Sequence, residues 1–413
     1  MYVHLFGYVA SYAGYVQLRY SYRLYPTPGQ QQALARAFGC ARVVFNDALA
    51  ARKAAYEADE PYVTDAALSA RLTEAKKTPE RAWLGEVSSV VLQQALADLN
   101  AAYRNFFASA TGKRKGPKVA PPRFRSRKDG RQAIRFTANA RFKVLQNGRL
   151  RLPKIGDVEV RWSRDLPAVP SSVTVIKDAA GRFFASFVVT AVPRPLLETE
   201  AKCGIDLGLG HFAVLDDGTK ITAPRFLRRA EKKLKQAQRD LSRKEKGSNR
   251  RDKARARVAR AHAHVTGARR DFHHKLSTAI IRENQAVYVE DLAVKALART
   301  RLAKSVHDAG WSAFVSMLEY KAALHGRDFQ RIGRFEPTSQ VCSTCGVKDG
   351  PKPLSVRAWQ CKDCGAVHDR DVNAARNILA LGRRERLNAR GGQVRPLPAV
   401  AQAVEAGSRR GAA

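Results

Sequence analysis

Four of the chain's six cysteines lie in two close pairs with the spacing of a metal site. Cys342 and Cys345 form one C-x2-C pair, and Cys361 and Cys364 form the other. Four thiolates close a tetrahedral site with no open position, so the spacing predicts one structural zinc ion. A pair of disulfides or a redox C-x2-C motif are the alternatives, and a cytosolic chain favours neither.

Three acidic residues stand beside apolar segments in a chain that is otherwise basic. Asp206 and Glu290 end short apolar stretches, and Asp371 opens a predicted helix directly after the cysteines. Taken singly, a turn residue, a solvated strand end and a helix N-cap are ordinary roles for them. Taken together, two strand-end carboxylates and a third on a packed helix can converge. Carboxylates are preferred ligands of Mg²⁺, and two such ions can drive phosphodiester hydrolysis, so we expect a Mg²⁺-dependent site here.

The 413-residue chain has a net charge of +37, from 74 Lys and Arg against 37 Asp and Glu. Such a charge repels itself in a compact state unless a polyanion is near. Nucleic acid is therefore the expected partner, ahead of an acidic membrane surface or of a basic protein without a partner. A hydrophobic content of 45% excludes a wholly disordered chain. We expect a cytoplasmic protein without a membrane partner, because no apolar run reaches the roughly 20 residues that span a bilayer.

Two segments concentrate the positive charge. Residues 112–131 form a loop whose prolines exclude a helix, and residues 226–275 are predicted to form two antiparallel helices joined near Gly247. A solvated loop and a solvated helix pair with salt bridges are the alternatives, but the charge imbalance favours contacts with phosphates. The candidate nucleic-acid-binding residues are Lys113, Arg114, Lys115, Lys118, Arg123, Arg125, Arg127, Lys128, Arg228, Arg229, Lys232, Lys233 and Lys235.

The elements that must position these residues follow from periodicity and turn signals. Thr27, Pro28 and Gln30 predict a capped helix start after a strand at 18–25. Period-2 alternation over 133–192 predicts a small antiparallel sheet or barrel that the strand at 18–25 can join. Further helices are predicted at 64–77, 88–107, 311–326 and 371–384, and short strands at 203–208, 212–215 and 286–289. Trp311 is expected to be a core aromatic rather than a base-stacking platform.

Several motifs, in this order along the chain, resemble the TnpB family. These proteins are encoded by insertion sequences, are related to the compact type V CRISPR effectors and are often described as transposases. The resemblance covers roughly residues 18–395. Besides the four cysteines, it rests on Tyr22–Thr27, Gly39–Arg42, Pro122–Phe124, Gly204–Gly208, Val289–Leu292, Asp308–Trp311, Asp369–Ile378 and Asn388–Gly392.

The resemblance implies an RNA-guided DNA endonuclease that reads a short motif beside its target. The implied partners are a guide RNA from the transposon end and double-stranded target DNA, bound by a monomer in the ribonucleoprotein. Asp206, Glu290 and Asp371 match the family's catalytic and Mg²⁺-binding acids, and Asp369 is expected to be a structural partner. A nuclease-inactive RNA-guided DNA-binding regulator, an accessory protein in transposition and a zinc-ribbon RNA-binding protein are the alternatives. The complete set of acids favours the nuclease.

The resemblance also implies a multidomain α/β architecture. The first part is a small wedge-like β-barrel domain with an inserted helical recognition lobe. It precedes a RuvC-like, RNase H-type nuclease fold, into which a helical hairpin and a zinc ribbon are inserted. The expected boundaries are an uncertain leader at 1–17, the first wedge strand at 18–30, the recognition lobe at 31–130, the rest of the wedge-like domain at 131–200, the nuclease domain at 201–336, the zinc ribbon at 337–368, the final nuclease helix at 369–390 and a disordered tail at 391–413.

Overall fold

The computed structural model of the chain describes residues 9–12, 15–353, 355–389, 393–395 and 402–404. Contacts within the chain divide it into two compact units, Met1–Val192 and Pro193–Ala413. Each unit has its own sheet and its own hydrophobic core. Among the described residues, no helix is long and apolar enough to cross a membrane.

The first unit is built on a curled antiparallel sheet in the order β3-β7-β8-β2-β6-β5-β4, with β1 paired to β2. Its strands are β1 (Val9–Tyr12), β2 (Tyr15–Tyr25), β3 (Gln132–Thr137), β4 (Lys143–Val144), β5 (Leu150–Leu152), β6 (Gly156–Arg161), β7 (Ser172–Lys177) and β8 (Phe183–Ala191). The strand predicted at 18–25 does join this sheet, between β8 and β6. It begins at Tyr15, so part of the predicted leader is strand, and residues 1–8 and 13–14 lie outside the described residues.

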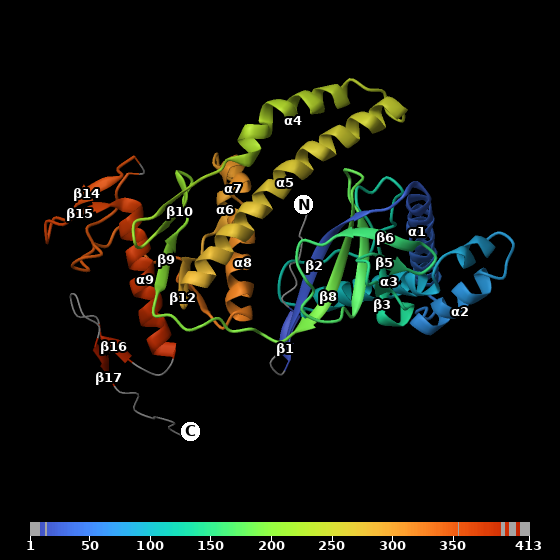
Figure 1. The fold of residues 1–413 in the computed structure, drawn as a ribbon, viewed down its shortest axis with the longest axis horizontal. Coiled ribbons are helices and arrows are strands. Elements are labelled where there is room, and N and C mark those ends of the chain that lie inside the picture. Colours follow the sequence, from blue (N-terminus) through green and yellow to red (C-terminus); the bar gives the residue numbers. More distant parts are fainter. Residues whose placement is uncertain (1–8, 13–14, 354, 390–392, 396–401, 405–413) are drawn as a thin grey trace. The chain divides into compact units, whose positions relative to one another are not determined.

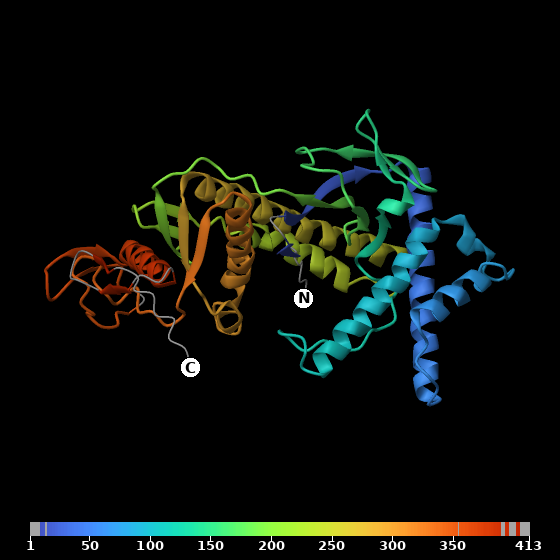
Figure 2. The same ribbon diagram turned by 90° about the horizontal axis from the view of Figure 1, so that it is seen from below.

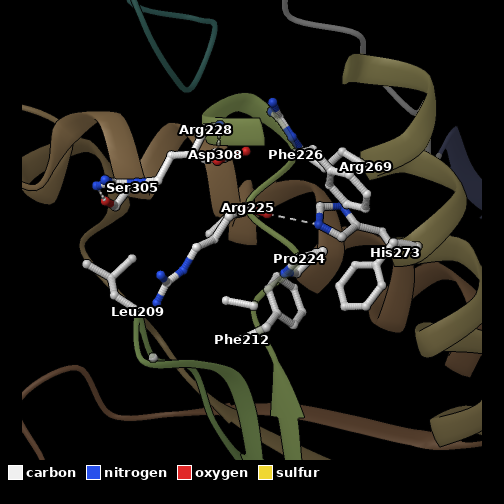
Figure 3. A pocket seen from close by; sticks show the side chains of 14 residues that line it. Leu209, Phe212, Pro224, Arg225, Phe226, Arg228, Arg269, His273, Ser305 and Asp308 are labelled. Carbon is white, nitrogen blue, oxygen red and sulfur yellow. Dashed lines mark hydrogen bonds between the residues drawn. The ribbon is translucent and has the colours of Figure 1, made fainter. Parts of the chain in front are cut away.

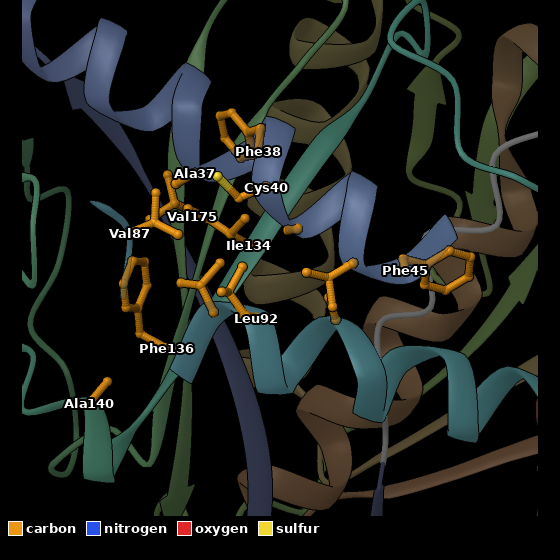
Figure 4. Packing of buried hydrophobic residues seen from close by; sticks show 14 of the residues in the cluster. Ala37, Phe38, Cys40, Phe45, Val87, Leu92, Ile134, Phe136, Ala140 and Val175 are labelled. Carbon is orange, nitrogen blue, oxygen red and sulfur yellow. The ribbon is translucent and has the colours of Figure 1, made fainter. Parts of the chain in front are cut away.

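Helices α1 (Pro28–Glu57) and α3 (Ser89–Ala110) pack against β3 of this sheet, and α2 (Asp65–Ala75) packs on α3. Their predicted positions are confirmed. The Thr27 side chain accepts a hydrogen bond from the Gln30 backbone N–H, and the Gln30 side chain accepts one from the Thr27 N–H, which completes the predicted capping box. Figure 2 shows α1 and α3 packed against each other. Figure 4 shows how α1, through Phe38, and β3, through Ile134 and Phe136, contribute to one core.

The second unit has a mixed sheet in the order β11-β10-β9-β12-β13. Its strands are β9 (Lys202–Asp206), β10 (His211–Leu215), β11 (Lys220–Thr222), β12 (Ala286–Glu290) and β13 (Asp328–Ile332). Strands β9, β12 and β13 run parallel to one another, and β10 runs antiparallel to β9. The sequence did not predict β13, because Ile332 is its only fully buried residue and its alternation is weak.

Helices lie on both faces of this sheet (Figure 1), with α9 (Arg370–Ala389) on one face and α5 (Asn249–Glu283) and α8 (Trp311–Leu324) on the other. The predicted basic hairpin is formed by α4 (Phe226–Ser242) and α5 (Asn249–Glu283). The C-terminal part of α5 is core rather than insertion, because His273, Ser277 and Ile280 are buried. Trp311 is 3% exposed, which confirms it as a core aromatic.

Short elements connect and extend this frame. Helices α6 (Val294–Leu297) and α7 (Ala303–Ala309) follow β12 and were not predicted. Strands β14 (Ala358–Gln360) and β15 (Val367–Asp369) form a hairpin in the cysteine-rich segment. In the predicted tail, β16 (Gln393–Arg395) pairs with β17 (Gln402–Val404). The rest of 391–413 lies outside the described residues.

Helix α9 approaches β9 so closely that residue 204 has no room for a side chain. A Cβ added at Gly204 would lie 2.2 Å from the carbonyl oxygen of Ala375 and 2.7 Å from the backbone nitrogen of Leu379. Backbone atoms cannot rotate out of the way as a side chain can. Glycine at this position therefore sets the distance between the helix and the sheet.

We expect Gly204→Ala to destabilise the chain by roughly 3 kcal/mol, at the upper end of overpacking costs, because α9 must move off β9. Urea unfolding followed by circular dichroism measures this loss. The matched control is Gly210→Ala, where an added Cβ meets nothing within 4 Å and the unfolding midpoint should hardly change. Equal midpoints for the two variants would contradict the packing argument.

Candidate active site

The parallel pairing of β9 and β12 brings two of the predicted acids together. Ile205 of β9 lies opposite Val289 of β12. Asp206 and Glu290 are the next residues of the two strands, so they end side by side at the same edge of the sheet. Both are half-buried, unlike an ordinary solvated strand end.

Helix α9 supplies the third acid. Ala375 packs over Gly204, and Asp371 lies about one helical turn before Ala375 on the same helix face. Asp371 is also half-buried. Its carboxylate acts electrostatically on Asp206, as does that of Glu290, so the three acids from β9, β12 and α9 share one region of the second unit.

The electrostatics of this region disfavour ionised carboxyl groups. Burial raises the pKa of Asp206 well above its usual range, and the neighbouring carboxylates of Glu290 and Asp371 raise it further. Burial also raises the pKa of Glu290, although a hydrogen bond from Thr338 opposes this shift. A cluster of acids that resists losing its protons is typical of a site that holds cations.

Two residues that the sequence did not single out orient these carboxylates. The Thr338 hydroxyl donates a hydrogen bond of 2.6 Å to Oε1 of Glu290. Nη1 of Arg357 donates to Oδ1 of Asp371 at 3.2 Å. Thr338 precedes the first cysteine pair and Arg357 lies between the two pairs, both in irregular segments where neither periodicity nor a motif marks them.

Asp369 has the capping role that the alternative interpretation gave to Asp371. Its Oδ1 accepts the backbone N–H groups of Asp371 and Val372, each at 3.1 Å. Its Oδ2 pairs with Nζ of Lys220 at 2.5 Å. Burial alone would raise the pKa of Asp369, but the Lys220 ion pair and the two N–H groups outweigh it, and the pKa is lowered. Asp371 is thereby free of the capping role.

The four cysteines converge as their spacing predicts. In the part of the chain that the structure describes, they are the one set of possible ligands with all donor atoms within 4.8 Å of one another. The Sγ atoms of Cys342 and Cys364 are 3.6 Å apart, and those of Cys345 and Cys361 are 3.7 Å apart. Four sulfurs at about 2.3 Å from a tetrahedral zinc would be about 3.8 Å apart, so the geometry fits that ion.

The first cysteine turn is bound directly to α9. The side-chain amides of Asn373 and Asn377 donate to the carbonyl oxygen of Val341, at 2.8 and 2.7 Å. Asn377 also donates to the carbonyl of Thr338 at 2.7 Å. Thr338 thus links three parts of the unit, because its hydroxyl binds Glu290 while its backbone binds the helix that carries Asp371.

The predicted phosphate-binding residues divide into two groups. Arg125 forms an ion pair with Asp98 at 3.3 Å and lies 3.7 Å from the centre of the Phe45 ring, so this arginine stabilises its own unit. Others with partners inside the protein are Arg114, Arg228 and Lys235. The remaining candidates are exposed: Lys113, Lys115, Lys118, Arg123, Arg127, Lys128, Arg229, Lys232 and Lys233.

Three family models match the chain. One described as "Probable transposase" covers residues 186–301, and one described as "Cas12f1-like, TNB domain" covers residues 311–378. A "Helix-turn-helix domain" model covers residues 16–61. In this structure most of that last segment is strand β2 and the single helix α1, rather than two helices joined by a turn.

Relatives match over nearly the whole length. A Streptomyces pristinaespiralis protein named "Putative RNA-guided DNA endonuclease" is 48% identical over 371 residues, which cover 89% of this chain and 90% of the relative. InsQ of Escherichia coli, which has the same descriptive name, is 32% identical and covers 86% and 90%. Cas12f1, solved in a complex with sgRNA and target DNA, superposes with a TM-score of 0.50 at 12% identity, covering 84% and 82%. Together with the motifs around Asp206, Glu290 and Asp371, these matches show that the chain belongs to the TnpB family.

Proposed function

We propose that this chain is an RNA-guided, metal-dependent DNA endonuclease encoded by a transposable element, which cleaves DNA beside a short target-adjacent motif. The observation that carries the proposal is the convergence of Asp206, Glu290 and Asp371 in a chain with a net charge of +37. A surface that only bound phosphates would gain nothing from three half-buried acids. The names of the Streptomyces and Escherichia coli relatives support this function.

The proposed nuclease domain is a RuvC-like, RNase H-type fold. Numbered from β9, the strand order is 3-2-1-4-5, in which strands 4 and 5 run parallel to strand 1. This order supports that assignment, as does the position of the acids on strands 1 and 4 and on a packed helix. The likeness to Cas12f1 supports the same overall fold.

Asp206, Glu290 and Asp371 would hold the metal ions. Mg²⁺ bound there would supply activation of a water and stabilisation of the leaving oxygen in phosphodiester hydrolysis. The chain's own residues prepare the site: Thr338 fixes one oxygen of Glu290, and Arg357 orients Asp371. Half-burial of the carboxylates limits competing water.

The zinc ion has a structural role in this proposal. Cys342, Cys345, Cys361 and Cys364 would bind it with four thiolates, which leaves no open position for a substrate. The ordered ribbon then holds the first turn of the cysteine segment against α9 through Asn373. We propose that zinc thereby positions Asp371 without taking part in the reaction.

The proposed partners are a guide RNA from the transposon end and double-stranded target DNA, bound by a cytoplasmic monomer. In RNA-guided systems, base pairing reads the sequence while the protein recognises the duplex by shape and charge. The exposed lysines and arginines of the 112–131 loop and of the α4–α5 hairpin are suited to that role.

The test is to sequence the RNA that co-purifies with the full chain and to place its guide complement in a plasmid library, beside a randomised flank that includes every short target-adjacent motif. We expect one class of RNA that includes the transposon end, and cleavage of the matching plasmid only in the presence of Mg²⁺. EDTA should abolish cleavage, and a plasmid without the complement should stay intact. Specific binding without cleavage would contradict the proposal and favour the DNA-binding regulator.

As the solution is acidified, the cleavage rate should fall at a higher pH than it would at a site built on an aspartate of ordinary pKa. The pKa of Asp206 is raised by burial and by its acidic neighbours, so its proton competes with the metal as the pH falls. We expect the acidic limb of the pH–rate profile to move to lower pH when the Mg²⁺ concentration is raised. Single-turnover rates at two Mg²⁺ concentrations measure this shift. An acidic limb at the same pH for both concentrations would contradict the prediction.

A further inference from the structure

A cavity of about 180 Å³ lies in the second unit beside the proposed catalytic strand. It is enclosed by the segment after β9, by the start of α4, by α5 and by α7 (Figure 3). Gly208 and Leu209 form its edge only a few residues after Asp206. Three residues of extended chain span at most about 10 Å, so the cavity is close to the cleavage site. The roles assigned above leave it unexplained.

The cavity carries more positive charge than its neighbours neutralise. Three arginines line it, Arg225, Arg228 and Arg269, against one acid, Asp308. The Asp308 carboxylate is already engaged, because it accepts the backbone N–H groups of Leu227 at 2.8 Å and of Arg228 at 3.2 Å. This carboxylate caps α4 and also acts electrostatically on Arg269, so one acid faces three arginines in the site.

Two of these arginines have unused donors. Arg225 is exposed at the mouth of the cavity, its guanidinium has no hydrogen-bond or ion-pair partner among the described residues, and its side chain extends toward Leu209 in Figure 3. Nε of Arg269 is buried and also lacks a partner. Buried donors are normally satisfied, so an unpartnered one that lines a cavity indicates a missing acceptor. Arg228 differs, since it donates to Ser305 at 2.8 Å.

The backbone at the mouth of the cavity is held in an unusual conformation. Arg225 has φ +50° and ψ +46°, in the left-handed region that favours glycine. A large side chain there is strained, and such strain is concentrated at binding sites. The left-handed backbone at Arg225 is unfavourable, as it is at Asp59, Arg141 and Lys154, and Arg225 is the one of these four that lines the cavity.

The opposite side of the cavity is aromatic. Phe272 meets Phe212 with ring centres 5.1 Å apart and Phe226 with ring centres 6.1 Å apart. Arginine donors beside aromatic faces suit a phosphate that is attached to a flat, partly apolar group. The volume is a little larger than the 150 Å³ of a cavity that binds benzene, so there is room for one such group and not for a duplex.

We propose that this cavity binds one phosphodiester of the DNA strand being cleaved, together with its sugar or base, close to the scissile bond. Arg225 and Arg269 would donate to the phosphate oxygens, and the phenylalanines would contact the attached nucleoside. This subsite would fix the position of the strand relative to Asp206. The inference rests on the proposed function for its choice of strand.

The test measures binding without cleavage, using the full chain with its co-purified RNA and with Asp206→Asn as the background. The probe is a fluorescein-labelled single-stranded oligodeoxynucleotide complementary to the guide. Arg225→Gly, which suits the left-handed backbone, should weaken its binding about tenfold and lower the slope of log K against log salt by about 0.7. Arg282→Ala is the matched control, since Arg282 is an exposed arginine of α5 that does not line the cavity.

A second arm identifies the phosphate. Single linkages of the probe are replaced, one at a time, by neutral methylphosphonates. We expect one linkage whose replacement weakens binding to the background protein but weakens it much less in Arg225→Gly, because the contact with Arg225 is already lost there and only that with Arg269 remains. In Arg282→Ala that linkage should keep its full effect.

The possible outcomes distinguish failure of the proposed subsite from failure of the proposed nuclease function. Equal effects of Arg225→Gly and Arg282→Ala, or no linkage that couples to Arg225, would overturn the inference. Loss of co-purified RNA in Arg225→Gly, with unchanged DNA affinity, would assign the cavity to the guide and also overturn it. If the parent chain does not cleave but the coupling is present, the proposed nuclease function fails and the subsite stands.

Discussion

Asp206→Asn should lower Mg²⁺-dependent cleavage of a guided target by at least about a thousandfold, because a carboxylate that holds the metal is replaced by a neutral amide. Guide-RNA binding should be unchanged, since Asp206 is half-buried at the end of β9 and is not one of the exposed lysines and arginines proposed to contact nucleic acid. Single-turnover cleavage and RNA binding measured on the same preparation separate the two effects. Cleavage at the parental rate would falsify the assignment of the three acids.

The same variant should behave unusually in a stability experiment. The raised pKa of Asp206 means that its ionised form is disfavoured in the folded chain. Such a group costs stability once the pH rises above its unfolded pKa of about 4, and asparagine removes that cost. In EDTA at neutral pH, Asp206→Asn should therefore unfold at the same or a higher temperature than the parent.

Mg²⁺ should reverse the order of the two unfolding temperatures, so that the parent becomes the more stable chain. Mg²⁺ that binds only the folded parent raises its melting temperature by mass action, whereas the Asp206→Asn variant loses this gain. The control is Asp217→Asn in the exposed β10–β11 turn, where the Asp217 side chain accepts the Thr219 N–H at 2.7 Å and asparagine can do the same. It should leave cleavage and the Mg²⁺ effect unchanged. A fall in the Asp206→Asn melting temperature in EDTA would show a structural role instead.

The acids could be predicted from sequence because each is next to a strong local signal. Asp206 and Glu290 end apolar strands, and parallel pairing of those strands carries them to one edge. Thr338 and Arg357 have no such signal. They come from irregular segments, and only the tertiary arrangement of the cysteine turn against α9 brings them to the carboxylates.

The same limit applies to charge. The run of cations in the 112–131 loop predicts phosphate contacts for all its members alike. Arg125 instead forms an ion pair with Asp98 and packs over the Phe45 ring within its own unit. Composition gives the sign and density of charge but not which side chains fold inward. Short or weakly buried elements, such as β13 and α7, were missed for a related reason, since three to seven residues carry little periodicity.

The cysteine cluster makes its own large contribution to the site through contacts that join it to the acids. The backbone of Val341, next to Cys342, accepts from Asn373 and Asn377 of α9, and Thr338 in the same loop binds Glu290. A four-thiolate zinc site contributes about 10 kcal/mol or more to the folding of such a segment. Loss of the ion should therefore release both Thr338 and the start of α9.

Cys361→Ser should accordingly reduce bound zinc from about one ion per chain to far less, and lower cleavage by about a hundredfold or more. The cause is displacement of Asp371 and Glu290, so the rest of the fold should stay intact. Metal analysis by mass spectrometry, limited proteolysis of residues 337–368 and single-turnover cleavage measure the three effects. Lys362→Ala is the matched control, because Lys362 is exposed between Cys361 and Cys364 and its replacement leaves every thiolate in place. That control should keep one zinc and the parental rate, and a zinc-free, fully active Cys361→Ser chain would exclude zinc as the support of the catalytic site.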